Sequence, residues 1–451
     1  MLNSRAMNDA LLAELRRLDG QTHLHPFTDH AAMHQRGTHV MESGSGCVLV
    51  DEVGRNLLDG LAGLWCVNVG YGRREIVDAV AEQMAKLSFY CSFFETTTEP
   101  TIRVAAWLAE RAPGRLERVF FTNSGSEANE SALKIIRAWQ KLRGKSSKHK
   151  ILSRTFSYHG VGIATTSLTG LPNCTDPFDL PLPGFVRIPG PYTYASGSGL
   201  DDAAYGAWCI DETERVIERE GADTIAAMFV EPVQGAGGVI LPPAGYLGAL
   251  RELCRRHDIV FVADEVITAF GRLGVWFASE MWDLDPDIMT VAKGLTSGYL
   301  PLGATLVSGE IAAALETNGY FAHGFTYSGH PVPAAAALAN LAILEREDLP
   351  GRVRTDVGPY FQNKIQALRT DPLVGEARGL GLIGAIELRV SPEVAAPGTA
   401  GVRAAALARE EGVIVRGIRD LIAISPPLVI SHEEIDRLFA ALARVLDRLR
   451  G

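Results

Sequence analysis

The chain of 451 residues lacks any strongly basic tract, and its 53 acidic residues outnumber its 43 basic ones, for a net charge of −10. Proteins that bind nucleic acid carry a basic footprint, so we expect no such partner. No apolar run approaches the roughly 20 residues that cross a membrane, and no basic stretch precedes an apolar one at the N-terminus. We therefore expect a cytoplasmic protein with no membrane partner.

The six cysteines form no C-x-x-C pair, which argues against a zinc ribbon and against a redox motif. Six thiols in so long a chain do not make a disulfide scaffold, and reduced thiols fit a cytoplasm. We expect no metal site. No G-x-G-x-x-G turn follows an early strand, which argues against a nicotinamide-dependent dehydrogenase.

Short apolar runs alternate with helical patterns from about residue 100 onward. The candidate strands are 119–122, 151–153, 226–230, 259–263, 288–292 and 304–308, and the candidate helices are 128–143, 205–220 and 246–257. Apolar strands separated by helices are typical of a mainly parallel α/β sheet that is covered on both faces. The Pro-, Gly- and Ser-rich stretch 171–204 departs from this pattern, and we expect loops there.

The two ends of the chain show other patterns. Residues 7–18 predict an amphipathic helix with Leu11, Leu12, Leu15 and Leu18 on one side, and residues 48–60 predict a hairpin. Helices are expected at 333–347, 400–412 and 432–450, the last capped by Ser431, and strands at 377–388 and 413–416. We predict a large domain over 71–330, and a smaller α+β domain from 331–451 together with the N-terminal segment 1–70.

Three charged residues each follow a candidate strand: Glu231, Asp264 and Lys293. Ligands of open α/β sheets bind beyond the carboxyl ends of the strands, so these side chains should converge on one sheet edge. The segment TNSGSEANE (122–130) follows another strand and opens a helix, where Gly125 permits a tight turn and Ser126 offers a hydroxyl. The N–H groups at such a helix start suit a phosphate.

Asp264 and Lys293 together indicate pyridoxal phosphate. This cofactor needs a lysine for its aldehyde, an acid facing its ring nitrogen and an anion site for its phosphate. A strand end shielded from water would lower the pKa of Lys293, as a lysine that attacks or accepts a proton requires. Gly294 would leave room beside the cofactor.

Two further segments offer contacts for this cofactor, each with an ordinary structural alternative. In FSYHGVG (156–162), Tyr158 and His159 could stack on a flat ring or could belong to the core. In FTYSGHP (325–331), Thr326 could donate its hydroxyl to phosphate or could cap the helix that starts near Pro333.

Six motifs occur in the order NSGSEAN, SYHG, EPVQG, DEVITAFGRLG, AKGLTSGYLPLG and FTYSGHP. Together they resemble the class III aminotransferases of pyridoxal-phosphate fold type I, from about residue 40 to the end of the chain. The resemblance implies a large domain with a mainly parallel, seven-stranded type of sheet that binds the cofactor, and a smaller α+β domain. It also implies a cycle between the aldehyde and amine forms of the cofactor.

The resemblance further implies a role for each motif residue. Lys293 would be the Schiff-base lysine and proton shuttle, and Asp264 would pair with the ring nitrogen, supported by a hydrogen bond from Glu231. The other cofactor contacts would be Gly125 and Ser126 at the phosphate, Tyr158 and Val266 on the two ring faces, His159, and Thr326 from the partner subunit. A homodimer with shared active sites follows from that last role.

Within the family, GLWCVNVGYG (63–72) and SFYCSFF (88–94) resemble the ω-amine:pyruvate transaminases. Trp65 and Phe93, with Tyr158, would wall the substrate pocket. Arg416 would bind the keto-acid carboxylate and swing aside for an amine, with Arg419 as a competitor for this role. The loop 264–274 departs from the commoner family form, which has Gly in place of Ala269 and Thr in place of Leu273.

The expected function is transfer of an amino group from an amine or ω-amino acid to a keto acid, with pyruvate as acceptor and 2-oxoglutarate as the alternative. The cofactor motifs also allow a decarboxylase or an aminomutase, because the substrate bond that breaks depends on its orientation to the ring. A non-catalytic scaffold would leave the lysine, the aspartate and the Gly–Ser turn unexplained. Taurine, β-alanine, diamines and arylalkyl amines all remain possible donors.

Overall fold

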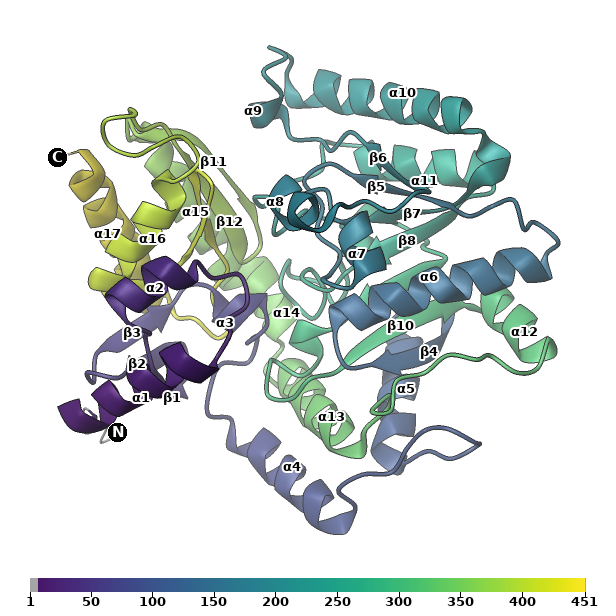
Figure 1. Cartoon of the computed structure of the whole chain (residues 1–451), viewed down its shortest axis with the longest axis horizontal. Coiled ribbons are helices and arrows are strands. Elements are labelled where there is room, and N and C mark those ends of the chain that lie inside the picture. The colour runs from purple at the N-terminus through teal and green to yellow at the C-terminus, as the bar shows by residue number, and fades with distance from the viewer. Residues whose placement is uncertain (1–6, 451) are drawn as a thin grey trace.

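The computed structural model describes residues 7–450, and its largest sheet, with seven strands, lies on the right in Figure 1; we call it the central sheet. The strands lie in the order β4 (Leu116–Thr122), β10 (Gly303–Ser308), β9 (Ile288–Val291), β8 (Val260–Asp264), β7 (Ile225–Val230), β5 (Lys150–Arg154) and β6 (Phe185–Ile188). Neighbours from β9 to β6 are parallel, and β10 is antiparallel to both β9 and β4. The predicted mainly parallel sheet and its six candidate strands are confirmed.

The strand β6 corrects the expectation of loops throughout 171–204. It pairs in parallel with β5, from Ile151 opposite Phe185 to Arg154 opposite Ile188. The strand has only four residues, is half-buried at the sheet edge and lies among prolines, so its sequence shows no alternation that would identify it. The same stretch also holds two short helices, α8 (Pro172–Thr175) and α9 (Thr193–Ser196).

Helices cover both faces of this sheet, and successive residues of the central strands point to opposite sides. Ala227 and Phe229 of β7 pack in one buried cluster with α6 (Gly125–Leu142). Met228 and Val230 pack in another with α11 (Tyr246–Arg256), beside α10 (Asp202–Glu220). The three predicted helices are therefore confirmed, and burial on both sides explains the continuous apolar strands.

The two ends of the chain form two smaller sheets. One joins β1 (Met41–Ser45), β2 (Val48–Asp51), β3 (Asn56–Asp59) and β13 (Val413–Ile414), so the N-terminal hairpin pairs with a C-terminal strand. The other joins β11 (Val374–Leu380), β12 (Ile383–Leu388), β15 (Leu421–Ile424) and β14 (Arg416–Ile418). The expected single strand at 413–416 is wrong, because the chain leaves the first sheet at Val415 and enters the second at Arg416.

The remaining helices lie mostly around these sheets. They are α1 (Asp9–Thr22), α2 (His30–Arg36), α3 (Ala62–Trp65), α4 (Arg74–Lys86), α5 (Glu99–Arg111), α7 (Ile163–Leu168), α12 (Gly309–Thr317), α13 (Pro331–Arg346), α14 (Leu349–Arg352), α15 (Gly358–Ala367), α16 (Ala400–Glu410) and α17 (His432–Arg450). The predicted cap of α17 is confirmed, since the Ser431 hydroxyl accepts from the N–H of Glu434 at 3.2 Å. The helix α1 exists, but Leu11 and Leu18 are exposed and only Leu12 is buried. Within residues 7–450, no helix has the length and apolarity to cross a membrane.

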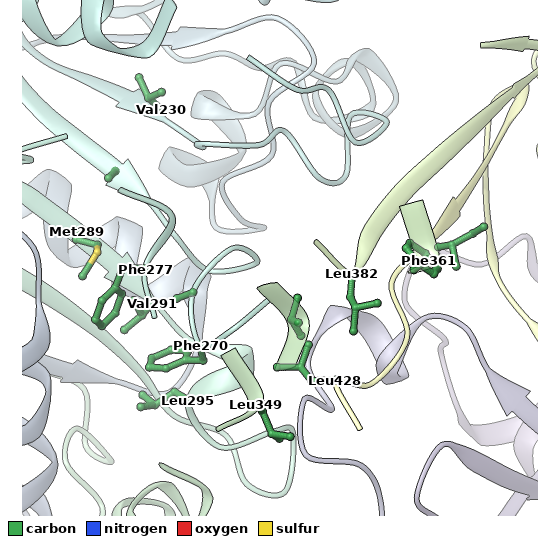
Figure 2. Packing of buried hydrophobic residues seen from close by; sticks show 14 of the residues in the cluster. Val230, Phe270, Phe277, Met289, Val291, Leu295, Leu349, Phe361, Leu382 and Leu428 are labelled. Atoms are coloured by element: carbon green, nitrogen blue, oxygen red, sulfur yellow. The ribbon is translucent and has the colours of Figure 1, made fainter. Parts of the chain in front are cut away.

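A continuous hydrophobic cluster connects the central sheet with the C-terminal part of the chain (Figure 2). It runs from Met289 and Val291 of β9 through Phe270 to Leu382 and Leu428. Leu295, two residues after Lys293, belongs to the same cluster and is fully buried. The turn that carries Lys293 is therefore held by buried residues both before and after it in the chain.

Candidate active site

Glu231, Asp264 and Lys293 lie at the carboxyl ends of three neighbouring strands. Asp264 is the last residue of β8, Glu231 follows β7, and Lys293 begins a short 3-10 turn two residues after β9. Since β7, β8 and β9 are adjacent and parallel, the three residues share one sheet edge. The sequence prediction of this convergence is confirmed.

Lys293 has two unusual properties. Its backbone is in the left-handed region with φ of +44°, which costs a residue with a side chain about 1–3 kcal/mol. Burial lowers the pKa of its ammonium, while the negative charge of Asp264 acts in the opposite direction. A lysine with a depressed pKa exists partly as the neutral amine, which is the form that attacks a carbonyl.

The turn after Lys293 is held by two asparagines that the sequence reading did not identify. Asn340 of α13 donates to the carbonyls of Gly294 at 2.8 Å and Leu295 at 3.0 Å. A side chain at Gly294 would come within 2.6 Å of the Asn68 amide, so the room left by this glycine serves Asn68 and not a cofactor. Asn68 in turn accepts a hydrogen bond from buried Arg272 at 3.0 Å.

Asp264 is held by a buried network of hydrogen bonds. Its Oδ2 accepts from Asn129 Nδ2 and from His159 Nδ1, both at 2.8 Å, and its Oδ1 accepts from the N–H of Val266 at 3.1 Å. Asn129 is itself fixed by the Thr290 hydroxyl at 3.0 Å. Three hydrogen bonds therefore set the orientation of the Asp264 carboxylate.

This network bears on two expectations. The side chain of His159 is completely buried and bonded to Asp264, so of the two alternatives that the sequence left open, stacking on a ligand ring or a place in the core, the structure supports the core. Glu231 is not the hydrogen-bonding support of Asp264, because its carboxylate accepts from the N–H groups of Tyr158 at 3.0 Å and Gly235 at 3.2 Å. Burial raises the pKa of Glu231 to about 7. The sequence reading did not identify Asn129, whose partner Asp264 lies 135 residues away.

The N-terminus of α6 forms an anion cradle at the same edge. Ser124 caps the helix by accepting from the N–H of Glu127, and within residues 7–450 the N–H groups of Gly125 and Ser126 have no acceptor. A side chain at Gly125 would lie 2.9 Å from Val266, and one at Gly160 would lie 2.7 Å from the Ser126 hydroxyl. The structure thus brings Gly125, Ser126 and Val266 together. Gly160 lies against Ser126 in the same cradle.

Arg416 and Arg419 differ clearly in their surroundings. Arg416 is half-buried near Tyr158 and Cys174, burial lowers its pKa, and no carboxylate in the described chain pairs with it. Arg419 lies 5.1 Å over the Phe156 ring and donates to the carbonyl of Gly237 at 3.1 Å. Arg419 therefore already has structural partners, whereas Arg416 remains available for a ligand.

The remaining predicted residues, Trp65, Phe93 and Thr326, differ in their exposure. Trp65 is only 2% exposed and packs in a buried cluster with Val233 and Val239. Phe93 lines a surface hollow with Lys134 and residues 320–324, and Thr326 is exposed nearby in the sequence. Thr326 does not cap α13, because the cap is the His330 side chain, which accepts from the N–H of Val332.

Two residues of the loop 264–274 differ from the commoner family form, and both fit the structure. Ala269 and Leu273 are 3% and 4% exposed, so both belong to the core around the loop. The loop is also fixed by Arg272, which donates to the carbonyls of Leu382 and Pro426.

A model of the family described as Aminotransferase class-III matches residues 31–446. A putrescine–pyruvate aminotransferase of Pseudomonas aeruginosa is 42% identical over 99% of this chain and 98% of its own length. A diaminobutyrate–2-oxoglutarate transaminase of Halomonas elongata is 38% identical over 94% of each chain.

Solved structures with the same fold include omega transaminases. One from Thermomicrobium roseum, described as (S)-enantioselective, has 43% identity and a TM-score of 0.93 over 97% of this chain and 99% of its own. One from Pseudomonas jessenii in complex with PMP has 39% identity and a TM-score of 0.93, over 96% and 98% of the two chains. A thermostable variant with Trp, Phe and Arg substitutions, engineered for synthesis of bulky amines, has 38% identity and a TM-score of 0.93 over 97% and 99%.

Proposed function

Because the chain belongs to the class III aminotransferases, we propose that it moves an amino group from an amine or ω-amino acid to pyruvate, with Lys293 as the catalytic residue. Members of this family depend on pyridoxal phosphate. The observation that carries the proposal is the shared sheet edge, which holds both a lysine of lowered pKa and an oriented, buried aspartate.

The residues at this edge fit the cofactor. The free N–H groups of Gly125 and Ser126 suit its phosphate, Asp264 suits a protonated ring nitrogen, and Tyr158 and Val266 would lie on the ring faces. When bound, the cofactor withdraws electrons from the substrate carbon that carries the amino group. Lys293 would accept the proton from that carbon and donate it to a neighbouring carbon. His159 and Asn129 would hold the Asp264 carboxylate in place.

The half-buried Arg416 supports pyruvate as acceptor. Pyruvate carries one carboxylate, and Arg416 is a guanidinium without a carboxylate partner in the described part of the chain. The alternative, 2-oxoglutarate, carries two carboxylates and would need a second basic group, and Arg419 is already engaged with Phe156 and Gly237. The relatives include both pyruvate and 2-oxoglutarate enzymes, so the acceptor is a proposal from the site.

We also propose that the enzyme is a homodimer whose active sites combine residues of both chains. Phe93 and Thr326 lie beside large exposed aromatic side chains, among them Phe94 and Tyr320, which are 82% and 86% exposed. Apolar surface of this kind marks a protein interface. Thr326 and Phe93 would then reach the partner's phosphate and substrate pocket, whereas Trp65 would act within its own chain. The engineered relative was changed at the same three residue types that we propose for the substrate pocket, Trp65, Phe93 and Arg416.

The domain boundaries remain part of the proposal. We assign residues 71–330 to the large domain that binds the cofactor, and 331–451 to the small domain. Residues 1–70 would belong to the small domain, and the pairing of β3 with β13 supports this assignment.

The test is the substitution Lys293→Ala. The purified wild type should be yellow, lose its colour with an amine donor and regain it with pyruvate, with alanine as the product. Lys293→Ala should lose the visible absorbance and the turnover, because no covalent bond to the cofactor can form. Lys141→Ala, at an exposed position on α6, is the matched control and should behave as wild type. Release of carbon dioxide in place of alanine would favour a decarboxylase, and wild-type turnover by Lys293→Ala would refute the role of this lysine.

A further inference from the structure

Histidines are concentrated in the N-terminal segment. Five of the eleven histidines lie between residues 23 and 39, namely His23, His25, His30, His34 and His39. The structure places the first two just after α1, whose last turns carry Asp19. None of these residues belongs to the proposed reaction site.

Asp19, His23 and His25 direct their polar atoms toward one point. His25 Nε2 lies 2.9 Å from both oxygens of Asp19, and His23 Nδ1 lies 3.1 Å from Oδ1. The three ligand atoms are all within 4.8 Å of one another, and they form the one such group of three or more found within residues 7–450. The centroids of the two imidazole rings are 4.1 Å apart.

Neighbouring residues hold this group in position. The Thr38 hydroxyl donates to Asp19 Oδ2, and Arg16 Nε fixes the Thr38 carbonyl at 3.0 Å. His30 Nε2 accepts from the N–H of His25 at 3.0 Å, which fixes the backbone beside that ligand. The Thr38 hydroxyl first, and then the hydrogen bonds from His25 and His23, lower the pKa of the Asp19 carboxyl to about 2. Residues that orient metal ligands in this way are as much a part of a metal site as the ligands themselves.

We propose that Asp19, His23 and His25 bind a first-row transition-metal ion, with Zn²⁺ as the favoured ion, at a site separate from the transamination chemistry. Two imidazoles and one carboxylate are ligands that Zn²⁺ accepts, with bonds of about 2.0–2.2 Å. In a tetrahedron with such bonds the ligand atoms stand about 3.3 Å apart, so distances of 2.9 and 3.1 Å require only a small expansion. Water would complete the coordination, since the His23 side chain is 59% exposed and leaves the ion accessible.

The ion would bridge two segments of the chain. It would connect the end of α1 with the turn that leads to α2, and, through the Thr38 contact to Asp19, with the residues that precede β1. The site therefore binds a structural cation, and no step of amino transfer passes through it.

The test uses the cofactor-loaded enzyme and zinc chloride alone, measured by isothermal titration calorimetry. The wild type should bind one Zn²⁺ per chain at this site, and the double variant His23→Gln/His25→Gln should bind it at least about 100-fold more weakly. Thr38→Val, which releases the Asp19 carboxylate, should weaken binding roughly ten- to 100-fold. His432→Gln is the matched control, because His432 pairs with Asp356 at 2.9 Å but has no second histidine beside it.

Diffraction at the zinc absorption edge locates the ion independently. A peak within bonding distance of Asp19, His23 and His25 is expected from crystals soaked in zinc chloride. Equal affinity and stoichiometry in the wild type and in a correctly folded double variant, checked by thermal unfolding without metal, would overturn the proposal. A zinc peak at thiols or other histidines, with none at Asp19, His23 and His25, would overturn it as well.

Discussion

The role of Arg416 can be separated from that of its neighbour Arg419 by substitution. Hydrogen bonds to charged groups contribute about 1.5–3 kcal/mol, so Arg416→Ala should lower kcat/KM for pyruvate roughly ten- to 150-fold. The half-reaction with an amine that has no carboxylate should change only a few-fold, because Arg416 has no partner in that donor. Single-turnover loss of the visible absorbance measures the amine half, and its recovery with pyruvate measures the other.

Arg419→Ala is the control for this experiment. Arg419 contacts Phe156 and Gly237, so its loss should lower stability and leave the preference between amine and pyruvate unchanged. Equal losses in both half-reactions of Arg416→Ala would indicate general damage to the site. An unchanged reaction with pyruvate would remove Arg416 from the carboxylate site.

At the scale of single residues, the sequence identifies groups whose chemistry depends on local position. Lys293, Asp264 and Glu231 were found because each directly follows an apolar strand. Asn129 was missed because its partner Asp264 lies 135 residues away, and only the folded sheet brings the two together. The proposed zinc ligands Asp19, His23 and His25 lie close together in the sequence, but the sequence does not show that Thr38, from a segment beyond α2, orients Asp19.

At the scale of elements, Gly160 sets how closely the loop after β5 approaches the start of α6. Its φ is +135°, and a Cβ there would stand 2.7 Å from the Ser126 hydroxyl and 2.8 Å from Ser126 Cα. Gly160→Ala must therefore push the loop away from the phosphate cradle. Strain of about 1–3 kcal/mol would weaken the affinity for pyridoxal phosphate roughly five- to 150-fold, measured by equilibrium dialysis.

Gly144→Ala separates this effect from backbone strain alone. Gly144 also has a positive φ, +73°, but nothing lies within 4 Å of its added Cβ. Its substitution should lower the free energy of unfolding by about 1 kcal/mol and leave cofactor affinity unchanged. If both variants held the cofactor as tightly as wild type, Gly160 would have no part in the cradle.

Strands were predictable from the sequence where every one of their residues is buried. The strands β7, β8 and β9 are buried on both faces and appear as unbroken apolar runs, so their positions were found within about one residue. The strand β6 is half-buried and four residues long, and its pairing with β5 is a contact that local sequence does not encode. The run 413–416 was misread because the two sheets it joins are defined by the distant partners β3 and β15.

At the scale of the whole molecule, each chain carries Lys293 in one place and the pair Phe93 and Thr326 in another. The first lies at the edge of the central sheet, and the second lies beside exposed aromatic side chains. A C2 dimer presents the same surface of both chains to each other, so it can bring the second group of one chain to the first group of its partner. The family resemblance of FTYSGHP predicts this arrangement, whereas composition and periodicity within one chain do not.

Mixed dimers test this arrangement directly. One chain carries Lys293→Ala and the other carries Thr326→Asp, whose carboxylate should repel the phosphate. Dimers of either variant alone should therefore have little activity. If Thr326 serves the partner's site, each mixed dimer contains one intact site, built from Lys293 of the second chain and Thr326 of the first. Random exchange of equal amounts makes about half of the dimers mixed, so about a quarter of all sites should regain wild-type turnover. If Thr326 served its own chain, every site in the mixture would lack either the lysine or the threonine, and the activity would stay at the level of the separate variants.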